Sequence, residues 1–347
     1  MKIAILGDMH IGSRNDLKLF HDYFGKFYSD IFFPQIQEMG VERIIQLGDL
    51  FDRRKYINFY SLAESKRYFF DKLPCPMDTL VGNHDLYWRE SVTVNSSSLV
   101  LGEYPNITVH TKPTTISLDD GTTIDVIPWI CAENEKEIFD FINESKSDIC
   151  VGHFEVAGFS MYRGMEAHAG LDGNIFAKYE LVLSGHYHTR SKKENIIYAG
   201  VPYEMTWSDY NDPKGFHIFD TETRELTFHQ NPYTMFVRLE YDDSKEMTSL
   251  DALDLKDSIV KLVVINKTDY YKFDQYVNKL YSKGCYEIKI VEDMSEFTDG
   301  EVGEEINLED TVSVLMNYID SLETEEDIDK IKAFMKSLYI EAVNVEV

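Results

Sequence analysis

Five short segments between residues 8 and 188 combine glycine with acidic, amide and imidazole side chains. Along the chain they are Asp8-Met9-His10, Gly48-Asp49, Gly82-Asn83-His84-Asp85, Gly152-His153 and Gly185-His186-Tyr187-His188. Imidazole nitrogens suit Mn, Fe or Zn, carboxylate oxygens suit harder divalent ions, and one aspartate can bridge two ions. Brought together in the folded chain, these residues would form a two-metal centre.

Each segment taken singly indicates little, because Gly and Asp favour turns and a buried histidine is usually a hydrogen-bonded core residue. The position of the segments is more informative. Each follows a short run rich in Val, Ile and Leu that predicts a buried strand, at residues 3–6, 43–47, 78–81, 148–151 and 180–183. Loops at strand ends commonly carry the sites of α/β folds, so the succession favours a functional site.

Two aromatic-rich helices are expected between the first three strands, near residues 17–39 and 59–73. Apolar side chains recur there at helical spacing, and Pro34 is expected to kink or restart the first helix. Covering a sheet requires only one apolar face on each helix. The density of Phe and Tyr therefore leaves two interpretations open, simple coverage of the sheet or a second buried face such as a dimer interface.

The last third of the chain is organised differently from the α/β unit at residues 1–230. Strands over 236–241, 259–265 and 286–291, with a helix over 270–283, predict a small α+β module at 231–293. An acidic linker at 294–305 then precedes a pair of amphipathic helices within 306–347. Those helices are too short to bury their apolar stripes alone, so we expect them to dock on a partner or on their own small module.

The chain has 347 residues and a net charge of −27, from 34 basic and 61 acidic residues. This charge excludes strong DNA binding by the chain alone, away from metals and partners, because phosphate contacts come from Lys and Arg. Residues 290–347 hold 17 acidic and three basic residues, and their net charge of −14 is half of the total. Four widely spaced cysteines, with no signal sequence or membrane span, predict a cytoplasmic protein.

The series DxH, GD, GNHD, GH and GHxH resembles the calcineurin-like metallophosphoesterase superfamily. The resemblance implies a four-layer α/β/β/α sandwich with two divalent metal ions, for which Mn is expected and Mg is the alternative. It also implies the ligands: Asp8, His10 and His188 for one metal, Asn83, His153 and His186 for the other, and Asp49 as the bridge. The metals would clamp a phosphate and lower the pKa of a bound water.

Three nearby residues would act around the metals. His84 is not a ligand in the superfamily pattern and would stabilise or protonate the leaving oxygen. Asp52 matches the position whose carboxylate orients that histidine, and Asp85 is the alternative. Arg53 completes a GDxxDR spelling in which the arginine binds phosphate in Ser/Thr protein phosphatases, although a solvated arginine explains it equally well.

Features outside the motifs resemble one branch of the superfamily, the SbcD-type nuclease subunits of double-strand-break repair complexes, particularly the version of large tailed phages. They are Ile127-Pro128-Trp129, the loop 158–171, and the segments 198–202 and 212–216. The resemblance implies that 231–293 is a capping domain and that 306–347 binds the coiled coil of an SMC-like ATPase. It also implies a homodimer through the helices near 17–39 and 59–73.

The expected function is hydrolysis of DNA phosphodiesters by the nuclease subunit of a recombination and break-repair complex. The resemblance implies exonuclease action on duplex ends and endonuclease action on single strands, in the host cytoplasm if the chain is phage-encoded. A stand-alone Ser/Thr phosphatase or cyclic-nucleotide phosphodiesterase is the alternative. A non-catalytic scaffold subunit is the second alternative, and it fits poorly because a structural metal site would not need His84.

Overall fold

The computed structural model describes residues 1–162, 165–167, 170–245 and 249–292, with the backbone alone at 161, 162 and 165. Residues Met1–Val291 form one compact unit. The expected linker at 294–305 and helix pair at 306–347 lie outside the described residues. None of the helices described in these ranges has the length and apolar character needed to span a membrane.

The first sheet has six strands in the order β16-β15-β1-β2-β3-β6. Strands β1, β2, β3 and β6 are parallel to one another. Strand β15 pairs antiparallel with β1, and β16 pairs antiparallel with β15. The strands are β1 (Lys2–Leu6), β2 (Arg43–Gln46), β3 (Met77–Leu80), β6 (Ile107–His110), β15 (Gly215–Asp220) and β16 (Leu226–Gln230).

The second sheet also has six strands, in the order β13-β14-β12-β9-β8-β7. Strands β14, β12, β9 and β8 are parallel, with antiparallel β13 and β7 at the two edges. The strands are β7 (Thr114–Ser117), β8 (Thr123–Ile127), β9 (Ile149–His153), β12 (Leu181–Gly185), β13 (Ser191–Lys193) and β14 (Ile196–Tyr198).

The alternation of side chains along the strands explains the layers. In β1, Ile3 and Ile5 belong to a core shared with the second sheet, whereas Ala4 and Leu6 belong to the core under the helices. Successive strand residues point to opposite faces, so a strand that is apolar throughout must be covered on both sides. The two sheets therefore pack face to face between outer helical layers, which confirms the expected α/β/β/α sandwich.

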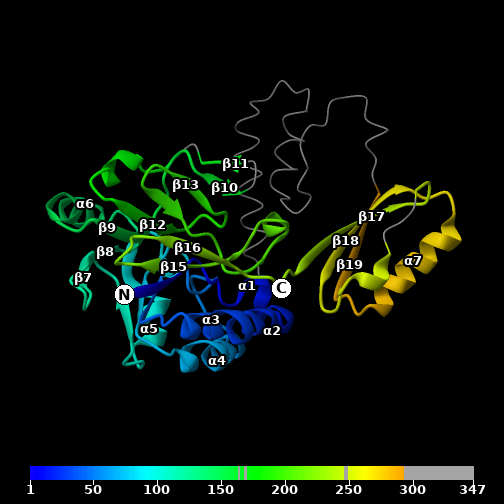
Figure 1. Cartoon of the computed structure of the whole chain (residues 1–347), viewed down its shortest axis with the longest axis horizontal. Helices are drawn as coiled ribbons and strands as arrows, with labels where there is room; N and C mark the ends of the chain where they lie inside the picture. Colours follow the sequence, from blue (N-terminus) through cyan, green and yellow to red (C-terminus); the bar gives the residue numbers. More distant parts are fainter. Residues whose placement is uncertain (163–164, 168–169, 246–248, 293–347) are drawn as a thin grey trace, which may run out of the picture. The chain divides into compact units, whose positions relative to one another are not determined.

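Helices of the two outer layers come from separate parts of the chain. Figure 1 shows the helices of residues 13–101 on one side of the sandwich and the helix of residues 135–144 apart from them. The helices are α1 (Ser13–Asp16), α2 (Lys18–Phe27), α3 (Phe33–Glu38), α4 (Phe59–Tyr68), α5 (Ser96–Leu101) and α6 (Glu135–Glu144). A π-helical turn, Tyr28–Phe32, joins α2 to α3, and Pro34 lies in the first turn of α3, which confirms the expected restart.

The aromatic side chains of these helices are largely buried within the same chain. Phe20, Phe24, Phe27, Phe32 and Phe69 are at most 1% exposed and belong to the core beneath the first sheet. The density of aromatic residues is therefore accounted for without a second chain. Homodimerisation through these helices stays a proposal, and its support has to come from the side chains that remain exposed.

The small module has the expected elements. Strands β17 (Phe236–Asp242), β18 (Ile259–Asn266) and β19 (Glu287–Glu292) form a three-stranded sheet, and α7 (Tyr270–Ser282) lies between the last two strands in sequence. Its own core contains Tyr241, Leu262 and Leu280, all fully buried. A buried carboxylate anchors its first strand, because Glu204 accepts hydrogen bonds from the backbone N–H groups of Met235 and Phe236 at 2.7 and 3.0 Å.

Candidate metal centre

The two sheets deliver different chemical groups to the same edge of the sandwich. The segments after β1, β2 and β3 carry Asp8, His10, Asp49 and Asn83, whereas those at the ends of β9 and β12 carry His153, His186 and His188. Parallel strands end at a common edge, so side chains that are far apart in sequence meet there. All seven expected metal ligands lie in this one neighbourhood.

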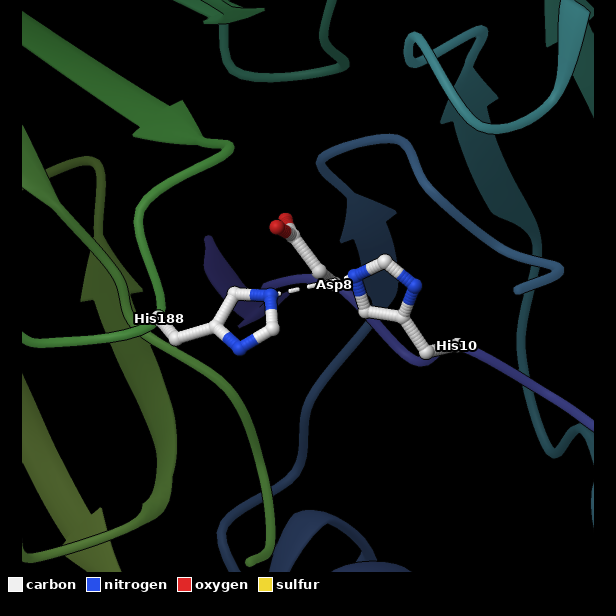
Figure 2. A group of neighbouring side chains, drawn as sticks. All are labelled: Asp8, His10 and His188. Atoms are coloured by element: carbon white, nitrogen blue, oxygen red, sulfur yellow. Dashed lines mark hydrogen bonds between the residues drawn. The ribbon is translucent and has the colours of Figure 1, made fainter. Parts of the chain in front are cut away.

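One group of possible ligands consists of Asp8, His10 and His188, whose ligand atoms lie within 4.8 Å of one another. The Nε2 atoms of His10 and His188 are 3.1 Å apart. Figure 2 shows the two imidazole rings turned toward each other, with the Asp8 side chain beside them. Two ring nitrogens that converge beside a buried carboxylate are the donor set expected around one transition-metal ion.

A second group consists of Asp49, His153 and His186, again with ligand atoms within 4.8 Å. The amide oxygen of Asn83 lies between the two rings, 2.9 Å from Nε2 of His153 and 3.0 Å from Nδ1 of His186. The Oδ2 atom of Asp49 is 3.3 Å from Nε2 of His153 and 3.9 Å from Nε2 of His10. Asp49 therefore faces both groups, which is the placement that a bridging carboxylate needs.

Neighbouring groups fix which nitrogen each of two rings presents. Nδ1 of His153 is 2.7 Å from the backbone oxygen of Leu47, and Nδ1 of His10 is 3.4 Å from Oδ1 of Asp52. A protonated Nδ1 that faces an oxygen leaves Nε2 with its lone pair available to a metal. The residues therefore fit two divalent ions, both in the donor atoms and in the orientation of these rings.

Burial and charge shift the pKa values of the site in opposite directions. Burial opposes the charged form of His10, but Asp52 and Asp49 outweigh it and raise its pKa to about 9. For His188, burial together with the charge of His10 lowers the pKa to about 3. Burial also opposes ionisation of Asp49, yet His153, His84 and His10 hold its pKa well below the usual range. Asp49 is thus kept as a carboxylate.

The backbone of the site is strained at three of its functional residues. His10, Asp49 and His186 have positive φ values of 42°, 50° and 88°, a region that side-chain-bearing residues seldom adopt. Glycine permits close approach between the sheets, because a Cβ at Gly185 would lie 2.5 Å from both Oδ1 of Asp8 and the backbone oxygen of Leu47. Strain of this kind persists only where surrounding contacts over-determine the geometry.

The structure corrects the expected role of the Asp52 carboxylate. Nδ1 of His84 is 2.6 Å from the backbone oxygen of Asp52, whereas the carboxylate of Asp52 faces His10. The alternative, Asp85, accepts hydrogen bonds from the backbone N–H groups of Leu50 and Gly82 at 3.1 and 2.9 Å. Neither carboxylate orients His84. A main-chain oxygen does so, and motif spacing cannot reveal that.

Other residues have contacts that the motifs did not predict. The ring of Trp129 lies 5.2 Å from that of His186 and 5.9 Å from that of His153, so it forms a wall of the second group. Lys214 is buried and donates to the backbone oxygen of His188 at 3.0 Å while it pairs with Asp209. The sequence indicates both residues only as parts of segments typical of one family branch.

The structure describes the side chain of Arg53 but only part of the loop 158–171. Arg53 donates to Oδ2 of Asp16 at 2.6 Å and to Asn15 at 2.9 Å, so it is a partly exposed, ion-paired side chain. In the loop, side chains 161–165 and residues 168–169 lie outside the described part of the chain. The resemblance of this loop to that of SbcD-type nucleases therefore stays a prediction.

Known proteins resemble this chain both in the segments that carry the motifs and over its whole length. The sequence profile described as calcineurin-like phosphoesterase matches residues 1–190. The chain is 33% identical over 354 aligned positions to exonuclease subunit 1 of Enterobacteria phage T4, with 99% of each chain covered. It belongs to the calcineurin-like phosphoesterase family.

Two weaker relatives of this calcineurin-like phosphoesterase are subunits of the nuclease SbcCD. The chain is 23% identical to the one from Staphylococcus epidermidis, with 79% of the chain and 78% of the relative covered. It is 24% identical to the corresponding protein from Staphylococcus saprophyticus, with 65% and 67% covered. The similarity to these proteins therefore extends beyond residue 190, where the family profile ends.

Proposed function

We propose that the chain is the nuclease subunit of a DNA recombination and double-strand-break repair complex and hydrolyses DNA phosphodiesters at a two-metal centre. The observation that carries this proposal is the convergence of oxygen and nitrogen donors from both sheets in a chain that aligns end to end with a phage exonuclease subunit. A phosphoesterase fold alone would not select a DNA substrate.

We assign one metal to Asp8, His10 and His188 and the other to Asn83, His153 and His186, with Asp49 between them. Mg prefers a shell of oxygen ligands and keeps several waters, whereas imidazole mixed with carboxylate suits a transition metal better. When bound, the pair of ions would orient the phosphate and activate a water molecule for attack on phosphorus. This donor set fits a divalent transition metal, and we propose Mn because the family resemblance implies it.

The chain itself positions the remaining groups. His84 is held at both its backbone and its ring, since its N–H donates to Oδ1 of Asp49 at 2.6 Å and its Nδ1 faces the oxygen of Asp52. With Nδ1 engaged, Nε2 is the ring nitrogen left to bind or protonate the leaving oxygen. Asp52 acts through His10 as a positioning residue, because its carboxylate faces Nδ1 of that ligand.

A hairpin that follows His84 and Asp85 in the chain supplies groups suited to a nucleic acid strand. It consists of β4 (Leu86–Trp88) and β5 (Ser91–Asn95), directly after His84 and Asp85. The rings of Tyr87 and Trp88 are 42% and 55% exposed, and aromatic rings of this kind stack on unpaired bases. The hairpin is anchored, because the carboxylate of Glu133 accepts from the N–H of Val92 and the hydroxyl of Thr93.

Two arginines add positive charge at this place on an acidic chain. Among the described residues, neither Arg54 nor Arg89 has an ion pair, and the buried Nη1 of Arg54 has no hydrogen-bond partner. Burial and the neighbouring charge of Arg89 lower the pKa of the Arg54 guanidinium. Asp49 and Asp85 oppose that shift, but neither forms an ion pair with Arg54. The guanidinium groups of Arg54 and Arg89 are therefore suited to a phosphate of the bound strand.

The partners are proposals that rest on the relatives and on exposed side chains. Relatives named as subunits support a partner protein, and we assign the SMC-like ATPase to residues 306–347. Deleting 306–347 should abolish co-elution with the ATPase, and persistence of the complex would refute the assignment. Homodimerisation is supported by Phe59, which is 89% exposed at the start of α4, so Phe59→Asp should convert a dimer into a monomer in light scattering.

The experiment that tests the function compares substrates. Full-length protein with Mn should cleave linear duplex and hairpin DNA, and EDTA should stop the reaction. A phosphopeptide and a cyclic dinucleotide serve as substrates for the two alternative enzymes. Rapid turnover of either one with inert DNA would contradict the proposal, and no turnover of any substrate would favour a scaffold subunit.

A further inference from the structure

A second site lies away from the metals, between the open edges of the two sheets. It is a cavity of about 430 Å³ that is lined from one sheet by β13 and β14 and from the other by β15 and β16. Ligand pockets in proteins commonly range from about 300 to 1,000 Å³, so the volume suits a small organic molecule. Nothing in the metal centre uses these residues.

The cavity is separated from the metal centre along the strands. It is lined by Leu181, the first residue of β12, whereas the metal ligand His186 follows Gly185, the last residue. Four residues of extended strand span about 13 Å. The cavity therefore extends to the end of β12 that is opposite the metal ligands, and Arg190 is the one lining residue within two positions of a ligand, His188.

Positive charge is concentrated at the cavity although the whole chain carries −27. Arg190, Lys192 and Arg224 line it, and Glu180 is the one acidic residue among the lining side chains. Within the described part of the chain, none of these three basic side chains has an ion pair. Burial lowers the pKa of Arg190 and Asp212 opposes that shift, but Asp212 is already paired with Lys214 at 2.7 Å.

Two buried nitrogens of the lining have no hydrogen-bond partner among the described residues. They are Nδ1 of His217 and Nε of Arg190. His217 is 5% exposed, and burial together with the charges of Arg190 and His229 lowers its pKa to about 3, so the ring is neutral at physiological pH. Buried polar groups are nearly always satisfied, and an unsatisfied one calls for a ligand or an ordered water.

The rest of the lining is mostly apolar. The guanidinium carbon of Arg190 lies 3.4 Å from the ring centroid of Phe228, which fixes the plane of its donor fork. Side chains of Ile149, Ile197, Phe219 and Leu226 complete the wall. A ligand that satisfies this lining carries an anionic group for the basic side chains and an apolar, planar group for the wall.

We propose that this cavity binds a nucleoside monophosphate, with the phosphate on Arg190, Lys192 and Arg224 and the base against the apolar wall. The choice of a nucleotide rests on the proposed nuclease function, because hydrolysis of a terminal DNA phosphodiester releases such a molecule. The presence of an anion site rests only on the orphaned basic groups and on His217.

The test measures binding without metal and without DNA. Full-length protein in EDTA is titrated calorimetrically with deoxyadenosine monophosphate, with deoxyadenosine and with inorganic phosphate. We expect the nucleotide to bind more tightly than either fragment. The double variant Lys192→Ala/Arg224→Ala should weaken it at least about tenfold, the minimum expected from losing two charged contacts. Arg190 is left intact because it lies two residues from the ligand His188.

A charge-matched control uses the exposed residues Lys146 and Lys256, replaced together by alanine. This control should bind the nucleotide as the unaltered protein does, with the same melting temperature. Equal binding of nucleotide by the Lys192/Arg224 variant would overturn the site, and phosphate binding as tight as nucleotide binding would overturn the assignment of the base. Failure of the nuclease proposal would show separately, as inert DNA in the cleavage assay.

Discussion

The two sheets share an architecture but contribute unequally to the proposed metal centre. The first supplies every oxygen donor, Asp8, Asp49 and Asn83, together with His10, whereas the second supplies only imidazoles. An oxygen donor of the first sheet can face nitrogens of the second. The amide oxygen of Asn83, for example, lies between the rings of His153 and His186. Because neither sheet holds a complete ligand set, the centre depends on how the two sheets pack.

Removing the carboxylate that faces both groups should impair the centre most. Asp49→Asn removes the negative charge near both His10 and His153. We expect kcat on DNA to fall by more than about 100-fold, the upper range for losing a partner that only supports a ligand. Cleavage and Mn binding would be measured side by side, with Asp140→Asn on the exposed face of α6 as the control. Near-normal cleavage by Asp49→Asn would contradict the bridging role.

The packing between the sheets can be disturbed without touching a ligand. Gly185→Ala places a Cβ 2.5 Å from Oδ1 of Asp8 and from the Leu47 oxygen, so the sheets must move apart at the centre. We expect loss of cleavage and a fall in the free energy of unfolding of about 1–3 kcal/mol, the usual cost of overpacking. Gly25→Ala is the control, because its nearest contact would be an ordinary 3.5 Å to Tyr68. Equal behaviour of the two variants would show that the sheets are not held at Gly185.

Loss of a residue that only orients a metal ligand should reduce activity less than loss of the ligand itself. Asp52→Asn removes the charge that faces Nδ1 of His10 but leaves the backbone oxygen that holds His84. We expect Mn affinity at one of the two sites to fall by about 10- to 100-fold, with activity recovered at high Mn. Calorimetric titration with Mn would measure this. If activity were lost at every Mn concentration, Asp52 would act on the reaction and not through His10.

The exposed hairpin should affect substrate binding and leave the metals unchanged. Trp88→Ala removes a ring that is 55% exposed. Stacking on one base is worth about 1–3 kcal/mol, so KM for single-stranded DNA should rise by several-fold or more while Mn binding is unaltered. Tyr271→Ala, 72% exposed on α7, is the aromatic control. A change in kcat on a small phosphodiester such as bis-p-nitrophenyl phosphate would point instead to damage at the metals.

A smaller effect, on stability alone, is expected from replacing Glu204, which belongs to neither group of metal ligands. Burial raises the pKa of Glu204 to about 7, although the N–H groups of Met235 and Phe236 oppose the shift. The pKa of Glu204 in the folded chain is above its ordinary value of 4.5. Its stabilising contribution to the free energy of unfolding is therefore full below pH 4.5 and is lost as the pH rises through about 7. Unfolding of Glu204→Gln should therefore show less loss of stability from pH 5 to 8 than unfolding of the original chain. An identical pH dependence in the two proteins would contradict the raised pKa of Glu204.

Much of the fold could be predicted from the chain. The strands at 3–6, 43–47 and 180–183 correspond to β1, β2 and β12, because buried parallel strands carry short, nearly continuous apolar runs. The antiparallel edge strands β7, β13 and β16 were not predicted. They are short and partly exposed, as in Ser191–Lys193, and lack a continuous apolar run. An edge strand forms because the adjacent strand has unpaired backbone N–H and C=O groups. The local sequence of the edge strand carries no information about those groups.

The candidate ligands could be identified without a structure, because glycine and metal-binding side chains at strand ends form a pattern within the chain itself. Their roles depend on tertiary packing. The Asp52 carboxylate faces His10, a main-chain oxygen holds His84, and Phe24 and Phe32 are buried in their own chain. The physical reason is that hydrogen bonds depend on distances of about 3 Å between atoms that distant segments bring together.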